Sequence, residues 1–140
     1  MLRGMIACGY PKHWAQFVRA LKSQPLGGIS GTTAICWWHD IEPADGHFNF
    51  AMIDEAIALS HARGIGIQIA VSAGGNTPEW LFAAGAERLE FRWSSHRGAT
   101  GKCDTVVVAP PWDDTFLHRF TRMAPLNLGE PQTIQRLGIV

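Results

Sequence analysis

The order of helix-like and strand-like segments predicts an α/β fold whose strands pair in parallel. Apolar residues recur along the chain with a helical period in some segments and with a period of two in others. Strand-like segments alternate with helix-like segments at the spacing of helical crossovers, which parallel pairing requires. At 140 residues the chain has the length of a single domain.

The first predicted helix begins at Pro11. Proline suits the first helical position, because the N–H that it lacks would have no partner there. The apolar residues that follow have the spacing of one helix face: Trp14, Phe17, Val18 and Leu21. Residues 25–28, PLGG, end this helix. Residues 29–38 are rich in β-favouring side chains, and we expect a strand there.

A loop, a second helix and a second strand are predicted next. Residues 39–46 contain a proline and an Asp-Gly turn pair, which indicates a loop. A helix over 49–63 ends before Gly64, which stands where a left-handed residue is favoured. Residues 65–71, IGIQIAV, alternate strictly. Their apolar face is expected to pack on helices, and their small or polar face to line a crevice or the inside of a barrel.

The third helix-like segment is short and precedes an irregular stretch. Thr77 is predicted to cap a helix that has proline at its first position and ends at Gly85. Residues 86–105 are mixed and polar, so we expect a long loop there. Residues 106–108, three valines, are expected to be extended before a Pro-Pro pair breaks the chain.

The last predicted elements are a helix and a strand. Asp113 or Asp114 can cap a helix that runs through Met123. Residues 134–140 read as the start of a further strand. An unpaired strand edge recruits other chains, so we expect self-association through open sheet edges.

Composition and charge argue against several classes of protein. Lysine plus arginine and aspartate plus glutamate each number 12, so no positive surplus is present to neutralise nucleic acid. No apolar run approaches the ~20 residues of a membrane span, and the first residues make a poor signal peptide. The three cysteines include no C-x-x-C pair, which favours reduced thiols and a cytoplasmic location.

The usual cofactor and nucleophile motifs do not fit. The glycine-rich residues 27–31 have the wrong spacing for a nucleophile elbow, a dinucleotide fingerprint or a P-loop. The six histidines are scattered without metal-ligand spacing. We therefore expect neither a cofactor nor a metal. Six tryptophans are unusual for this length, and they fit either a core of large rings or flat platforms for sugars or bases.

Three segments together resemble a known family of enzymes. Residues 37–50, WWHDIEPADGHFNF, are followed by an Ile-Asp pair, then by TPEWL at 77–81 and by PWD at 111–113. They resemble the second and third βα units of clan A glycoside hydrolases, and they are most similar to the β-galactosidases of family 42. The resemblance implies a partial (β/α)8 (TIM) barrel, roughly its first three to four βα units, with residues 1–140 as a single incomplete barrel domain.

The resemblance also implies a carbohydrate-binding site. In a parallel barrel the loops after the strands build the site, and tryptophans with polar neighbours match the faces and edges of sugars. The residues expected to bind carbohydrate are Trp38, His39, Glu42, Asn76, Trp80, Trp112 and Asp113. Structural roles remain open for several of them. The Glu42 carboxylate could bond loop amides, and the rings of Trp38 and Trp80 could belong to the core.

Catalytic residues are not expected among these side chains. Retaining glycoside hydrolysis uses two carboxyl groups about 5–5.5 Å apart. In the family resembled here, one follows an asparagine after the fourth strand and the other ends the seventh; no Asn-Glu pair follows residues 134–140. We therefore expect a glycoside hydrolase fragment that is inactive by itself. The alternatives are a non-catalytic carbohydrate-binding or assembly module, and a different small α/β enzyme.

Overall fold

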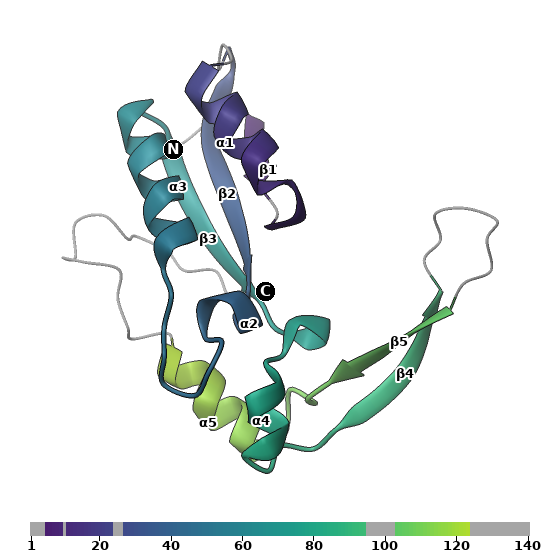
Figure 1. The fold of residues 1–140 in the computed structure, drawn as a ribbon. Helices are drawn as coiled ribbons and strands as arrows, with labels where there is room; N and C mark the ends of the chain where they lie inside the picture. Colours follow the sequence, from purple (N-terminus) through teal and green to yellow (C-terminus); the bar gives the residue numbers. More distant parts are fainter. Residues whose placement is uncertain (1–4, 10, 24–26, 95–102, 124–140) are drawn as a thin grey trace.

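The computed structural model describes residues 5–9, 11–23, 27–94 and 103–123, and its centre is a three-stranded parallel sheet (Figure 1). The strands are β1 (Met5–Gly9), β2 (Ile29–Trp37) and β3 (Gly66–Ser72), in that order across the sheet. β1 pairs with β2 in parallel, and β2 with β3. The predicted parallel α/β fold is thus confirmed for the first two predicted strands, and the expected strand at 134–140 lies outside the described residues.

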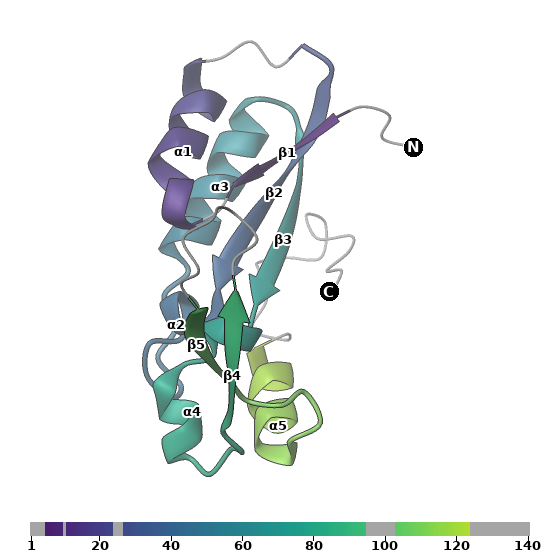
Figure 2. The same cartoon turned by 90° about the vertical axis from the view of Figure 1, so that its right-hand side faces the viewer.

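Two helices form the crossovers between these strands. They are α1 (Trp14–Ser23), which follows the 3₁₀ turn η1 (Pro11–His13), and α3 (Ala51–Ala62). Both helices match the predicted segments, and Gly64 adopts the left-handed conformation expected after α3, with φ of 64°. Figure 2 shows α1 and α3 on the same side of the sheet.

The two faces of the sheet differ, as the alternation predicts. Ala34 and Cys36 of β2 and Ile69 of β3 pack with α1 and α3 in one apolar core. On the opposite face, the register partners Thr33 and Gln68 are joined by a hydrogen bond of 3.3 Å from the threonine hydroxyl. Within the described part of the chain, the helices cover only the first of these faces.

A second group of elements lies at the carboxyl ends of β2 and β3. It comprises α2 (Trp38–Ile41), the 3₁₀ turn η2 (Gly74–Asn76), α4 (Glu79–Ala83), the strands β4 (Leu89–Ser94) and β5 (Cys103–Val108), and α5 (Asp114–Met123). A second apolar core joins α2, α4 and α5, and its buried members are Trp38, Leu81, Ala86, Ala109 and Phe116. The antiparallel pair β4–β5 extends away from the sheet in Figure 1.

The prediction of a loop over residues 86–105 was wrong. Part of this stretch forms β4, and the end of the stretch enters β5. Phe91 and Arg92 are both exposed, because a two-stranded arm presents both faces to solvent. Polar residues on such an arm give a composition that resembles a loop.

Three smaller expectations also need correction. Strand β1 was not predicted, because five residues give too short a pattern to separate from an irregular apolar start. The predicted loop over 39–46 begins with the single helical turn α2. Thr77 does not cap α4: its hydroxyl donates to the carbonyl of Gly74 at 2.7 Å, and Pro78 occupies the N-cap position.

The close approach of β1 and α1 requires a glycine. A Cβ added at Gly9 would lie 2.5 Å from Cγ of the buried Phe17 ring. We expect Gly9→Ala to lower the free energy of unfolding by about 1–3 kcal/mol, because the ring cannot move without disturbing the core. Urea denaturation measures this effect. Gly27→Ala is the control, since a Cβ there has no atom within 4 Å; equal stability of the two variants would contradict the prediction.

Candidate functional site

The candidate site lies where β2 and β3 end. Trp37 and Ser72, the last residues of these strands, are register partners in the parallel pair. The chain continues from them into α2 and toward η2. Because both strands point the same way, residues 35 positions apart in sequence meet at one edge of the sheet.

Trp38 is a buried part of this site. Its side chain is fully buried, and its indole N–H donates to Oε2 of Glu42 at 2.9 Å. Its ring meets Phe116 and Phe120 of α5 edge-on, with centroid distances of 5.6 and 5.1 Å. The sequence left open whether Trp38 belongs to the core or forms a platform for a sugar. The structure places it in the core, so its ring is not accessible to a sugar.

Glu42 is fully buried and hydrogen-bonded through both carboxylate oxygens. Besides the Trp38 indole, it accepts from the backbone N–H of Gly46 at 2.9 Å and from Arg122 of α5 at 2.7 Å. Arg122 also donates to Asp45 at 2.8 Å. That hydrogen bond holds the pKa of Asp45 below its ordinary value and raises the pKa of Arg122. The hydrogen bond from Arg122 to Glu42 raises the pKa of Arg122 further. The Glu42 charge is thus compensated inside the protein.

Trp80 of α4 completes this buried group. Its indole N–H donates to the backbone carbonyl of Glu42 at 2.8 Å, and its ring meets that of Trp38 edge-on at 5.9 Å. The structure therefore brings together Trp38, Glu42 and Trp80. Together with Arg122 they are referred to below as the Glu42 cluster. Trp80 remains partly exposed at its surface.

His39 and Asn76 lie on the two segments that leave the strands. Nε2 of His39 is 3.3 Å from Oδ1 of Asp40, and its ring lies against Trp37 at 5.5 Å. The amide of Asn76 donates to Oγ of Ser72 at 3.1 Å. Both side chains keep part of their surface open to solvent.

Trp112 and Asp113 lie just before α5. Asp113 caps this helix as predicted: Oδ1 accepts from the N–H of Phe116 at 2.8 Å and Oδ2 from that of Glu87 at 3.1 Å. These backbone hydrogen bonds hold the pKa of Asp113 below its ordinary value. Trp112 is 69% exposed, which makes it an accessible aromatic surface.

Three residues of the site were not among those predicted. Trp37 and Ser72 could have been found from the alternation of their strands, because each lies on the face opposite the helix-covered core. Arg122 reaches Glu42 across 80 positions of sequence, and no local pattern indicates that pairing.

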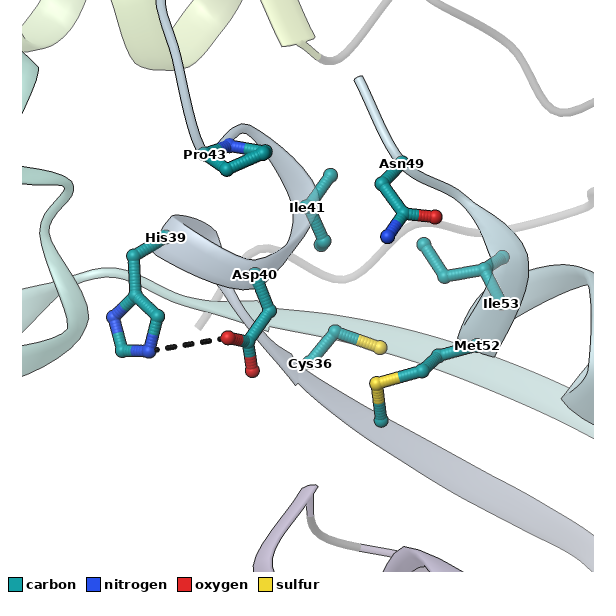
Figure 3. A pocket seen from close by; sticks show the side chains of 8 residues that line it. All are labelled: Cys36, His39, Asp40, Ile41, Pro43, Asn49, Met52 and Ile53. Carbon is teal, nitrogen blue, oxygen red and sulfur yellow. Dashed lines mark ion pairs between the residues drawn. The ribbon is translucent and has the colours of Figure 1, made fainter. Parts of the chain in front are cut away.

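A cavity of about 340 Å³ opens between α2 and the start of α3 (Figure 3). Its lining residues are Cys36, His39, Asp40, Ile41, Pro43, Asn49, Met52 and Ile53. Burial, with a smaller contribution from the charge of Asp40, raises the pKa of the Cys36 thiol to about 11. A thiol with so high a pKa is no nucleophile near neutral pH, since the thiolate is the reactive form.

The described residues hold neither a candidate metal centre nor a candidate membrane span. No group of three histidine, cysteine, aspartate or glutamate side chains in the described ranges is placed to hold a metal ion. No helix of the described chain is both long and apolar enough to cross a membrane.

Comparison with known proteins identifies the family. The sequence profile of glycoside hydrolase family 42, described as β-galactosidase, matches residues 9–121. The matched stretch begins at the last residue of β1 and includes all of β2 and β3, Glu42 and most of α5. The chain belongs to the β-galactosidase family of glycoside hydrolases, which confirms the resemblance found in the sequence.

Individual relatives agree with this family. β-Galactosidase BbgII from Bifidobacterium bifidum is 33% identical over 125 residues, which are 86% of this chain and 17% of that enzyme. The β-galactosidase from the Antarctic haloarchaeon Halorubrum lacusprofundi shares the fold, with a TM-score of 0.50 and 24% identity over 75% of this chain and 16% of that one. The chain thus spans less than a fifth of the length of either relative.

Removing the Glu42 carboxylate should destabilise the site strongly. Glu42→Ala leaves the Trp38 indole and part of Arg122 without partners, and we expect it to lower the free energy of unfolding by about 3 kcal/mol. Glu42→Gln should cost less, because its amide oxygen can still accept from Trp38. Urea denaturation followed by tryptophan fluorescence gives both values.

Asp45, the second carboxylate that accepts a hydrogen bond from Arg122, provides a matched control. Asp45 is exposed, so Asp45→Asn should change the free energy of unfolding by less than about 1 kcal/mol. If Glu42→Ala proves no more harmful than Asp45→Asn, the buried carboxylate does not hold this site together.

The Asp113 cap should give α5 a pH-dependent stability. The folded-state pKa lies below the ordinary 3.8, so the carboxylate stabilises the fold above that value. This contribution disappears as the pH falls through the folded-state pKa. Asp113→Asn should therefore be less stable than the wild type at pH 7, and the gap should narrow below about pH 4.

Urea denaturation of both proteins at pH 7 and pH 3 measures this gap. Asp114→Asn is the control, because it removes the same charge from the same helix end and leaves the hydrogen bonds to Phe116 and Glu87 in place. A gap that stays constant with pH would contradict the role of the Asp113 carboxylate.

Proposed function

We propose that this chain forms three βα units of a (β/α)8 barrel and that its strand ends bind the sugar of a β-galactoside. The single observation that carries the proposal is the meeting of aromatic and polar side chains at the carboxyl ends of β2 and β3, in a chain of the β-galactosidase family. In parallel barrels the substrate site is built at this end of the strands.

Support for the barrel comes from the asymmetry of the sheet. Its apolar face is covered by α1 and α3, and its opposite face carries Thr33 and Gln68. A barrel places its helices outside and its second face inside, which fits this division. In this proposal residues 1–140 form one incomplete barrel domain.

The predicted site residues divide into two groups by their exposure. His39, Asn76, Trp80 and Trp112 keep accessible surface and are proposed to contact the sugar. Trp38 and Glu42 are buried, and the carboxylate of Asp113 is engaged by two backbone N–H groups. These three are proposed to hold the exposed residues in place.

Hydrolysis is proposed to need carboxyl groups from outside the described site. A retaining mechanism requires a general acid and a nucleophile facing the same glycosidic bond. Near the strand ends, Asp40 lies against His39, and Glu42 is buried against Arg122. Asp45 is paired with the same arginine, and Asp113 caps α5. We therefore propose that the chain by itself binds a galactoside without cleaving it.

Two further parts of the proposal concern its surroundings. In the described three-stranded sheet, β1 and β3 each have a partner along only one edge, and open edges favour self-association. The buried free thiol of Cys36 fits a reducing cytoplasmic environment.

The experiment measures binding and turnover on the same purified chain. Isothermal titration calorimetry with methyl β-D-galactopyranoside should show saturable binding. Methyl α-D-mannopyranoside is the control sugar. Incubation with an aryl β-galactoside should release no phenol. Release of phenol would contradict the proposed lack of catalysis, and absence of saturable binding would contradict the galactoside site.

A non-catalytic carbohydrate-binding module is the second candidate. The same titration addresses it, with soluble β-linked oligosaccharides added as ligands. Tighter binding of an oligosaccharide than of the monosaccharide, without turnover, would favour such a module over a fragment of a hydrolase site.

A further inference from the structure

We propose that Trp37, rather than its neighbour Trp38, is the aromatic platform on which the sugar ring stacks. We further propose that Ser72 and Asn76 hydrogen-bond the hydroxyls along the edge of that ring. This inference rests on the galactoside-binding function proposed above, adds Trp37 and Ser72 to the residues that contact the sugar, and gives Trp37 the stacking contact. None of these three side chains is part of the Glu42 cluster.

The alternation along β2 places Trp37 on the face of the sheet opposite α1 and α3. Cys36 belongs to the core beneath α1 and α3, and successive side chains of a strand point to opposite faces. Thr33 lies four residues before Trp37, so the two share a face, and Thr33 contacts Gln68 there rather than the helices. Trp37 is therefore turned away from the helix layer.

The surface of Trp37 remains accessible to a ligand. Its side chain is only partly buried, and it is absent from both apolar cores of the described chain. The His39 ring lies against it at 5.5 Å with an angle of 56° between the planes. A tilted neighbour of this kind supports one edge of the indole and fixes its orientation.

Polar groups for the sugar's edge come from the neighbouring strand. Ser72 is the register partner of Trp37, and adjacent strands lie about 4.8 Å apart. Ser72 accepts a hydrogen bond from Asn76 at 3.1 Å, which leaves the serine O–H able to donate. The asparagine amide has a second N–H and a carbonyl oxygen for further bonds. One flat ring and two hydrogen-bonding side chains thus lie at the ends of two neighbouring strands.

The chemistry of a galactopyranoside matches this arrangement. One face of its ring presents mainly C–H groups, and its hydroxyls project along the edge and the other face. Burial of the C–H face against an indole is favourable, and the edge hydroxyls then reach the polar side chains. Trp38 cannot take this role because it is fully buried beneath Phe116 and Phe120.

The test follows the indole N–H signals of the ¹⁵N-labelled chain. Six tryptophans give six such signals, and the one missing from Trp37→Phe belongs to Trp37. Titration with methyl β-D-galactopyranoside should shift the Trp37 signal more than those of Trp38 and Trp80. Trp37→Ala should weaken binding about tenfold, and Trp37→Phe less, because a phenyl ring keeps part of the platform.

The matched control is Trp14→Phe. Trp14 lies on α1 in the helix layer, where its indole N–H donates to Glu55, and its loss should leave the affinity unchanged. If Trp37→Ala fails to fold, the signal shift in the wild type and the affinity of Trp37→Phe still decide the matter.

The outcomes separate this inference from the function on which it rests. Saturable binding with an unshifted Trp37 signal, or with an affinity that Trp37→Ala leaves unchanged, would overturn the role of Trp37 and keep the galactoside site. No binding by the wild-type chain would overturn both. A dominant shift at Trp37 with weakened binding by its variants would support both.

Discussion

The buried carboxylate of Glu42 is the interaction on which the strand-end half of this structure depends. It ties the end of α2 to the Trp38 indole, to the Gly46 backbone and to Arg122 of α5. A carboxylate removed from water is costly unless it is paired and hydrogen-bonded, so these elements must come together for it to be buried at all. The carbonyl of the same residue also holds the Trp80 indole, which places α4.

This arrangement places a buried cluster beside the exposed side chains that are proposed to contact the sugar, at one edge of the sheet. The Glu42 cluster fills the space beneath the strand ends with large rings and with a carboxylate that is hydrogen-bonded through both oxygens. Trp37, His39, Ser72 and Asn76 lie beside it with part of their surface open. A rigid base with exposed side chains on top is what precise ligand placement requires, because a contact residue is only as well oriented as the groups that pack behind it.

The fold was largely predictable where its signals are local. The period of two in IGIQIAV indicated both the strand and its helix-covered face, and the spacing from Trp14 to Leu21 indicated α1. The cap at Asp113 was also expected from residue type. The extended residues 106–108 of β5 were expected, whereas β4 and its pairing with β5 were missed. That pairing depends on a partner strand rather than on a pattern within one segment.

The sequence by itself determined the parallel α/β class and the family, since these follow from local periodicity and from motifs read along the chain. Only the tertiary structure decided which of two adjacent tryptophans is buried. Trp37 ends a strand and Trp38 begins a helix, and the helix turns the second ring into a core built by α5, some 80 residues away. Composition cannot separate the two residues, because burial depends on which distant elements arrive to cover each ring.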